Sequence, residues 1–157
     1  KIDGKKAKIV ASKIGDSGVA RTWTSSAIGY GSYSVVTGNG CAFGFGTDGL
    51  CCVGLSDGKA KWKWRPSDPK VANDQGEIML AGDKLVWISS SGMLYVRSAS
   101  PEKGAPLGEL KVLSDCSKDL RKDKAKYNNV VSTAPVFANG RIYVRSSWGE
   151  LACVDLK

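Results

Sequence analysis

The feature that most constrains the fold of this chain is a series of short apolar runs separated by Asx-Gly pairs. Three such pairs, at residues 39–40, 48–49 and 57–58, divide the stretch from Asn39 to Trp64. They suit hairpin turns because glycine adopts positive φ freely and Asn or Asp tolerates it. The last run alternates strictly between basic and apolar residues, which is the period of a half-buried strand. The stretch therefore predicts an antiparallel meander with strands at 41–45, 50–55 and 60–64.

This unit of strand, Gly turn and strand occurs again further along the chain. Its turn pairs are Asn39-Gly40, Gly82-Asp83 and Asn139-Gly140, and a leucine follows each pair at nearly the same distance. Repeats of roughly 40–50 residues built from short strands and Gly turns are typical of propeller blades. The sequence therefore predicts an all-β fold of β-propeller blades, with about three blades' worth of four-stranded antiparallel sheets.

We expect one propeller fragment over residues 1–157 rather than a closed ring. Propellers usually have about four to eight blades, and open sheet edges would expose unpaired backbone groups. Further blades of a larger propeller are therefore expected, from the rest of a parent chain or from other copies. Residues 16–30 are predicted to connect blades, and 100–108 to form a Pro/Gly loop before an outer strand at 110–113. The predicted pieces are a closing strand of a preceding blade (1–15), two blades (32–65 and 76–114) and a partial blade (130–157).

Composition excludes several classes of active site within this chain. It has 23 Lys and Arg against 15 Asp and Glu, and no histidine. Without histidine, Ser-His-Asp catalysis, haem attachment through C-x-x-C-H and imidazole zinc sites are excluded. The five cysteines contain no C-x-x-C pair, which argues against a thiolate zinc site. We therefore predict no catalytic, cofactor-binding or metal-binding residues.

Neither a targeting segment nor a membrane span is predicted. No stretch approaches the ~20 apolar residues that a membrane-spanning helix needs. The chain starts at Lys1, without Met or a charged-then-apolar leader. We therefore expect a mature, trimmed or excerpted piece.

A charged run at residues 115–127 departs from the blade pattern. The simpler interpretation is a solvated connection between blades. The functional interpretation is a basic patch that docks an acidic protein partner. That second interpretation assigns partner binding to Lys118, Arg121, Lys122, Lys124 and Lys126.

A second basic feature is the strand predicted at 60–64. Alternating lysine and tryptophan could neutralise phosphates and stack bases. However, neighbours along a strand point to opposite faces, so the two kinds of side chain cannot share one. A solvated outer strand is therefore favoured over nucleic-acid binding. The residues concerned are Lys59, Lys61, Lys63 and Arg65 on one face, and Trp62 and Trp64 on the other.

Two short motifs carry a family resemblance. Gly58-Lys-Ala-Lys-Trp62 matches a Gly-x-x-x-Trp pattern, and Cys153-Val-Asp155 matches a small-x-Asp pattern. Together they resemble the repeats of the PQQ-type, or quinoprotein-like, β-propeller family. The resemblance implies that Trp62 packs between adjacent blades, with Gly58, Cys153 and Asp155 as further blade-docking positions.

The chain departs from the family pattern at several points. Gly54 stands where the repeat has Asp, and Asp57 stands where it has Thr. The blade predicted around residues 78–113 has no Gly-x-x-x-Trp at all.

The family includes enzymes and binding proteins, so two functions remain open. Quinoprotein dehydrogenases use PQQ, a calcium or lanthanide ion and a catalytic Asp, often with a disulfide between adjacent cysteines, which invites comparison with Cys51-Cys52. On a strand these two side chains would point to opposite faces, so structural thiols are the simpler interpretation.

We expect a non-catalytic binding or scaffolding module of the bacterial cell envelope, with a periplasmic location implied by the resemblance. A protein partner and the remaining blades are its expected contacts, and no cofactor is expected. The alternative is a fragment of a PQQ-dependent alcohol or sugar dehydrogenase, which would hold PQQ with calcium.

Overall fold

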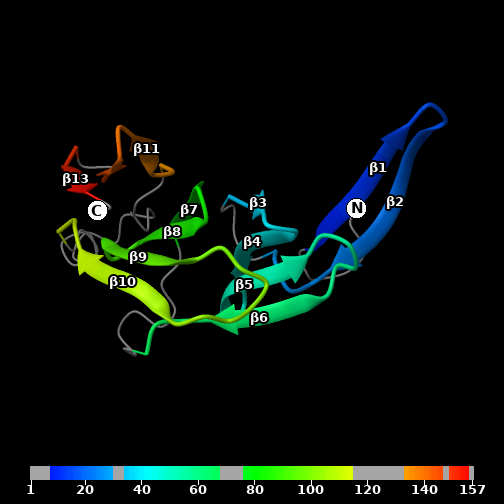
Figure 1. The fold of residues 1–157 in the computed structure, drawn as a ribbon, viewed down its shortest axis with the longest axis horizontal. Coiled ribbons are helices and arrows are strands. Elements are labelled where there is room, and N and C mark those ends of the chain that lie inside the picture. Colours follow the sequence, from blue (N-terminus) through cyan, green and yellow to red (C-terminus); the bar gives the residue numbers. More distant parts are fainter. Residues whose placement is uncertain (1–7, 30–33, 68–75, 115–132, 147–148, 156–157) are drawn as a thin grey trace, which may run out of the picture.

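The protein is described by a computed structural model covering residues 8–29, 34–67, 76–114, 133–146 and 149–155. These residues form thirteen β-strands in four antiparallel sheets and contain no helix. No helix in this part of the chain could therefore cross a membrane. Figure 1 shows the sheets following one another in sequence order, from a protruding hairpin at one end to the C-terminal strands at the other.

The strands and their turns follow from the Asx-Gly and Gly-Asx pairs. Asn39 and Gly40 both have positive φ, 50° and 73°, as a tight hairpin turn requires, and Asn139 and Gly140 repeat this with 52° and 74°. The predicted all-β architecture is confirmed. The first blade comprises β3 (Val36–Gly38), β4 (Cys41–Gly46), β5 (Gly49–Gly54) and β6 (Ala60–Trp64). The second comprises β7 (Gly76–Ala81), β8 (Lys84–Ser89), β9 (Met93–Ser98) and β10 (Pro106–Lys111), and the third comprises β11 (Val136–Ala138), β12 (Arg141–Arg145) and β13 (Leu151–Asp155).

The prediction that residues 16–30 only connect blades is wrong. The strand β2 (Gly18–Ser25) pairs with β1 (Ile9–Gly15) in a two-stranded hairpin, which is the protruding element in Figure 1. The sequence did not predict this strand because its residues are mostly small and polar. Such residues show little of the apolar alternation by which strands are recognised. Two strands therefore precede the first blade, where one was expected.

The Pro/Gly loop predicted at 100–108 is also shorter than expected. The outer strand β10 starts at Pro106, where a loop was predicted, and it ends at Lys111. Proline is tolerated there because β10 is the edge strand of its sheet and proline donates no ladder hydrogen bond.

Apolar side chains fill the three interfaces between successive sheets. We call these the first seam (hairpin against first blade), the second seam (first against second blade) and the third seam (second against third blade). Alternation along β8 shows the division, since Leu85 and Trp87 belong to the second seam while Val86 and Ile88 belong to the third. The second blade therefore buries both faces, and the hydrophobic core lies between sheets rather than within one.

Glycines allow close approach at the first seam. A Cβ on Gly46 would collide with the carbonyl oxygen of Ala27, and one on Gly44 would lie 2.7 Å from Ile28. The segment at 27–29 can therefore lie directly on β4, where the Gly29 amide donates to Phe45 O at 2.9 Å.

Candidate functional site

The second seam is centred on Trp62, whose side chain is only 6% exposed. Its ring packs against Phe43 of its own blade, with centroids 5.9 Å apart. Its Nε1 donates to the carbonyl oxygen of Ser100 in the second blade at 2.9 Å. Trp62 thus links two sheets through both an apolar contact and a hydrogen bond.

The acceptor belongs to a short connection between β9 and β10, residues 99–105, which we call the seam loop. The first blade reaches this loop at two further points. Asn39 Nδ2 donates to Ala99 O at 2.7 Å, and the Cys52 thiol lies 3.9 Å from Ser100 O. Asn39 therefore has two roles, as the turn residue of one blade and as a donor to the next. Only its turn role was predicted.

Arg97 adds a buried charge to the same seam. Its side chain is 3% exposed, and burial lowers the pKa of its guanidinium. Its Cζ lies 4.6 Å from the ring centroid of Trp64 and 5.8 Å from that of Trp62. Its Nη2 donates to the carbonyl oxygen of Gly104 in the seam loop. Sequence reasoning missed this residue because its neighbours come from another blade.

The first seam repeats the arrangement with a different tryptophan. Trp23 on β2 donates through Nε1 to Leu55 O, just after β5, at 2.7 Å. Gly58 lies against the same ring, since a Cβ there would be 2.7 Å from Trp23 Cδ2. The motif pairing Gly58 with Trp62 therefore serves two seams, because Gly58 contacts the preceding sheet and Trp62 the following one.

A bulge in β2 and another in β6 explain where these two tryptophans lie. Thr22 is skipped in the pairing of β2, and Lys61 is skipped in that of β6, so each tryptophan directly follows a bulged residue. A bulge locally redirects the side chain that follows it. The strand β10 has the same irregularity at Leu107, but the next residue is Gly108. The third seam therefore has no tryptophan at this position.

Aliphatic packing and one carboxylate hold the third seam together. Ile142 and Val144 of β12 are almost completely buried against the second blade. The Glu150 carboxylate accepts from the Ser114 amide at 2.9 Å and from its hydroxyl at 3.1 Å. This seam differs in chemistry from the second, which is dominated by aromatic rings.

The adjacent cysteines are separated by the strand that carries them. Cys51 points into the first seam and Cys52 into the second. Both are free thiols with almost no exposure, and burial raises the pKa of each, with a neighbouring Cys41 thiol adding to the effect at Cys52. The Cys51 thiol lies 3.4 Å from the carbonyl oxygen of Gly49 in its own strand. A cofactor-facing disulfide between these residues does not fit this geometry.

The structure resembles known proteins in its fold. No protein-family model matches the chain, and no curated protein matches its sequence. BamB from Moraxella catarrhalis matches with a TM-score of 0.63 and 12% identity, over 97% of this chain and 41% of that one. Quinohemoprotein alcohol dehydrogenase ADHIIG from Pseudomonas putida HK5 matches with a TM-score of 0.58 and 14% identity, over 80% of this chain and 19% of that one.

The chain folds as β-propeller blades. A computationally designed protein, Ika4, also matches, with a TM-score of 0.53 and 10% identity over 78% of this chain and 64% of its own. The chain spans about two fifths of BamB (41%) and a smaller share of the dehydrogenase (19%).

The C-terminal motif lies on β13, where the side chains of Cys153 and Asp155 are on an exposed face of the third blade. Cys153 pairs with Tyr143 as Cys52 pairs with Phe43, so it occupies the same position in its sheet. Cys153 is exposed, and Asp155 forms a 4.0 Å ion pair with Arg141 of its own blade. In the described part of the chain no further sheet covers this face, so a docking role for Cys153 and Asp155 remains a prediction.

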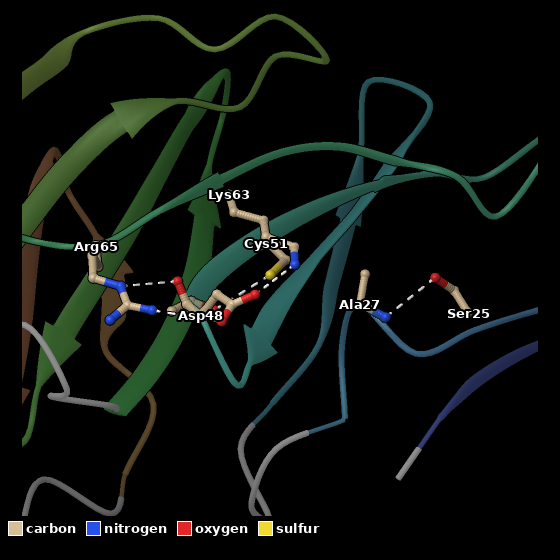
Figure 2. Close-up of polar contacts among 7 residues, drawn as sticks. Ser25, Ala27, Asp48, Cys51, Lys63 and Arg65 are labelled. Carbon is tan, nitrogen blue, oxygen red and sulfur yellow. Dashed lines mark hydrogen bonds and ion pairs between the residues drawn. The ribbon is translucent and has the colours of Figure 1, made fainter. Parts of the chain in front are cut away.

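The basic face of β6 is paired with acidic residues. Lys63 Nζ lies 2.6 Å from an Asp48 oxygen, and Arg65 lies 3.7 Å from the other oxygen, as Figure 2 shows. The hydrogen bond from Lys63 lowers the pKa of Asp48 and raises that of Lys63. Since Trp62 is buried on the opposite face, this geometry favours the solvated outer strand over a nucleic-acid surface. The other predicted basic site, Lys118 to Lys126, lies outside the described residues.

Exposure of the thiols gives a first test of the seams. We expect a maleimide to alkylate Cys153 in the folded protein, and to modify Cys41, Cys51 and Cys52 more slowly by a factor of about 10² or more. The reason is that each buried thiol reacts only when a core strand opens. Peptide mass spectrometry after timed labelling measures the four rates. Equal rates for Cys52 and Cys153 would show that the second seam is open.

Substitution of Gly58 tests its contact with Trp23. Gly58 has a φ of 68° and Gly40 has a φ of 73°, but a Cβ on Gly40 would have nothing within 4 Å. Gly40→Ala therefore measures the backbone strain alone. We expect Gly58→Ala to reduce the unfolding free energy by at least about 1 kcal/mol more than Gly40→Ala does, because of the added collision. Urea denaturation of both variants measures the difference, and equal losses would contradict the contact.

Proposed function

We propose that this chain is a non-catalytic binding or scaffolding module of a bacterial cell-envelope protein. The observation that carries the proposal is the separation of Cys51 and Cys52 into two different seams. The two buried thiols of β5 therefore take part in packing one sheet against the next. The fold similarity to BamB over 97% of the chain supports the same class.

The alternative, a PQQ-dependent dehydrogenase, requires a site for its cofactor and metal. The adjacent cysteines do not offer one, since their thiols lie on opposite faces of β5. Among the residues that the structure describes, no group of three or more Cys, Asp or Glu is placed to hold a metal ion. The described residues therefore give no support to a site for PQQ with calcium, and no catalytic step is assigned to them.

An acidic protein is the partner that the charge of the chain favours. The net charge is +8, and five cations are close together in the sequence, in the run from Lys118 to Lys126. Such a cluster favours encounter with an acidic surface, and the effect weakens as salt rises. Remaining blades, from the same or another chain, are the second expected contact. A periplasmic location follows from the family resemblance.

A matched pair of variants tests the partner-binding proposal. One variant replaces the cations of the run with glutamine, and the control replaces an equal number of exposed cations elsewhere, so both lose the same charge. We expect a single stoichiometric partner from a bacterial envelope extract to be retained by the wild type and the control and lost by the run variant. If both variants lost the partner equally, binding would depend on total charge and not on the run at residues 118–126. The run variant changes Lys118, Arg121, Lys122, Lys124 and Lys126, and the control changes Lys8, Lys13, Arg21, Lys59 and Lys103.

A separate experiment tests the enzymatic alternative. Any ligand that binds only the folded state raises its apparent stability. Under our proposal, PQQ with calcium leaves the thermal midpoint unchanged and gives no dye-linked oxidation of alcohols. A saturable rise in the midpoint together with turnover would overturn the proposal and favour the dehydrogenase.

A further inference from the structure

Arg97 is a buried cation that forms no ion pair with any carboxylate in the described part of the chain. Its side chain is 97% buried, yet none of the ion pairs among the described residues includes it. Buried charges in proteins are nearly always paired, because removing a charge from water is costly. The lowered pKa of Arg97 has burial as its cause. Some other group is therefore needed to balance this charge.

The partners that Arg97 does have leave part of its guanidinium unsatisfied. Trp64 and Trp62 stabilise the positive charge through their ring faces, at 4.6 and 5.8 Å. Nη2 donates to the Gly104 carbonyl. Nη1 is buried and has no hydrogen-bond partner in the described part of the chain. Ring faces cannot accept the N–H bonds of Nη1 as well as an oxygen or a halide can.

A second unpartnered donor lies in the same seam. Trp87 Nε1 is also buried without an acceptor among the described residues. Trp87 pairs with Tyr95 across β8 and β9, and Arg97 follows Tyr95 by two positions, so both side chains lie on one face of the second blade. The ring of Trp64 contacts both, at 4.6 Å from Arg97 and 5.6 Å from Trp87.

We propose that the second seam binds a small inorganic anion of the halide class through Arg97 Nη1, with Trp87 Nε1 as a second donor. Both orphaned groups are donors, so the missing ligand is an acceptor. A water molecule could accept from them, but it would leave the charge of Arg97 uncompensated. The surrounding rings pack with centroids 4.5–5.6 Å apart, which favours a monatomic ion over a bulky oxyanion.

Chloride titration at constant ionic strength tests this site. Sodium chloride replaces sodium gluconate step by step, and the thermal midpoint of the whole chain is followed by tryptophan fluorescence. An anion that binds only the folded state gives a saturable rise, expected here at about 2–4 °C. Bromide should replace chloride in this effect. A midpoint that does not respond to either halide would overturn the proposal.

Three variants assign the effect to a residue. Arg97→Met keeps the length and removes the charge, so the halide response should disappear. Trp87→Phe removes one donor, so the midpoint of the chloride titration should shift to a higher concentration by a factor of several. Arg141→Met removes an exposed arginine and should leave the response intact. A response retained in Arg97→Met would also overturn the proposal.

A crystallographic measurement keeps the proposal testable if Arg97→Met does not fold. Wild-type crystals grown with bromide should show an anomalous peak within hydrogen-bond distance of Arg97 Nη1. Density for water alone at that position, or a protein oxygen in contact with Nη1, would contradict the assignment.

Discussion

Replacing Trp62 with alanine should reduce the unfolding free energy by about 3–5 kcal/mol, the range for removing a large buried aromatic side chain. The substitution empties the centre of the second seam, where Trp62 packs on Phe43. It also leaves the Ser100 carbonyl without its donor. Urea denaturation followed by circular dichroism measures the loss.

Two further variants separate the causes of that loss. Trp62→Phe keeps an aromatic ring but cannot donate to Ser100, so its loss should be smaller, including about 0.5–1.5 kcal/mol for the hydrogen bond. Leu107→Ala changes a residue of β10 that is 60% exposed, and it should stay within about 0.5 kcal/mol of the wild type. If Trp62→Ala were no more destabilising than Leu107→Ala, Trp62 would have no role in docking the blades.

Replacing Ile142 with alanine should reduce the unfolding free energy by about 2–5 kcal/mol. Ile142 is fully buried in the third seam, where no tryptophan among the described residues shares the contact. The loss of stability should be largest in the third blade. The amides of β12 should therefore exchange with deuterium much faster than those of β8. Hydrogen exchange read by mass spectrometry distinguishes the two strands.

Val136→Ala is the matched control for that experiment. Val136 lies in the same sheet, on β11, but its side chain is 58% exposed. Its replacement should change stability by no more than about 0.5 kcal/mol. Equal effects of Ile142→Ala and Val136→Ala would mean that the third blade does not depend on the aliphatic seam.

The turns and the blade strands could be predicted because their signals are local. Asn39-Gly40 and Asn139-Gly140 combine positive φ with flanking apolar runs, which is enough to place a hairpin. The strand β2 lacks that signal, since its residues are mostly small, polar and exposed. Its existence depends on pairing with β1 and on contacts with the first blade. Those tertiary interactions are not visible in the composition of the segment.

Only one partner of the blade-docking contact, the donor Trp62, could be predicted from the sequence. The Gly-x-x-x-Trp pattern singled out Trp62, but its acceptor Ser100 is 38 residues away and has no sequence signal of its own. Trp23 was expected only as the one large anchor of a connection between blades, and its donation to Leu55 O was not predicted because its hairpin has no equivalent of Gly58 at the same spacing. The shared feature is a bulge before each tryptophan, and a bulge appears only once two strands are paired.

The alternation along β8 limits which changes of chain length the second blade can accept. Leu85 and Trp87 face aromatic neighbours, while Val86 and Ile88 face aliphatic ones. Inserting a single residue into this strand would rotate every later side chain to the opposite side. Rings would then meet a cavity shaped for branched aliphatic groups, and both adjoining interfaces would fail together. Insertions and deletions should therefore be tolerated in the connections between strands and rejected within β8.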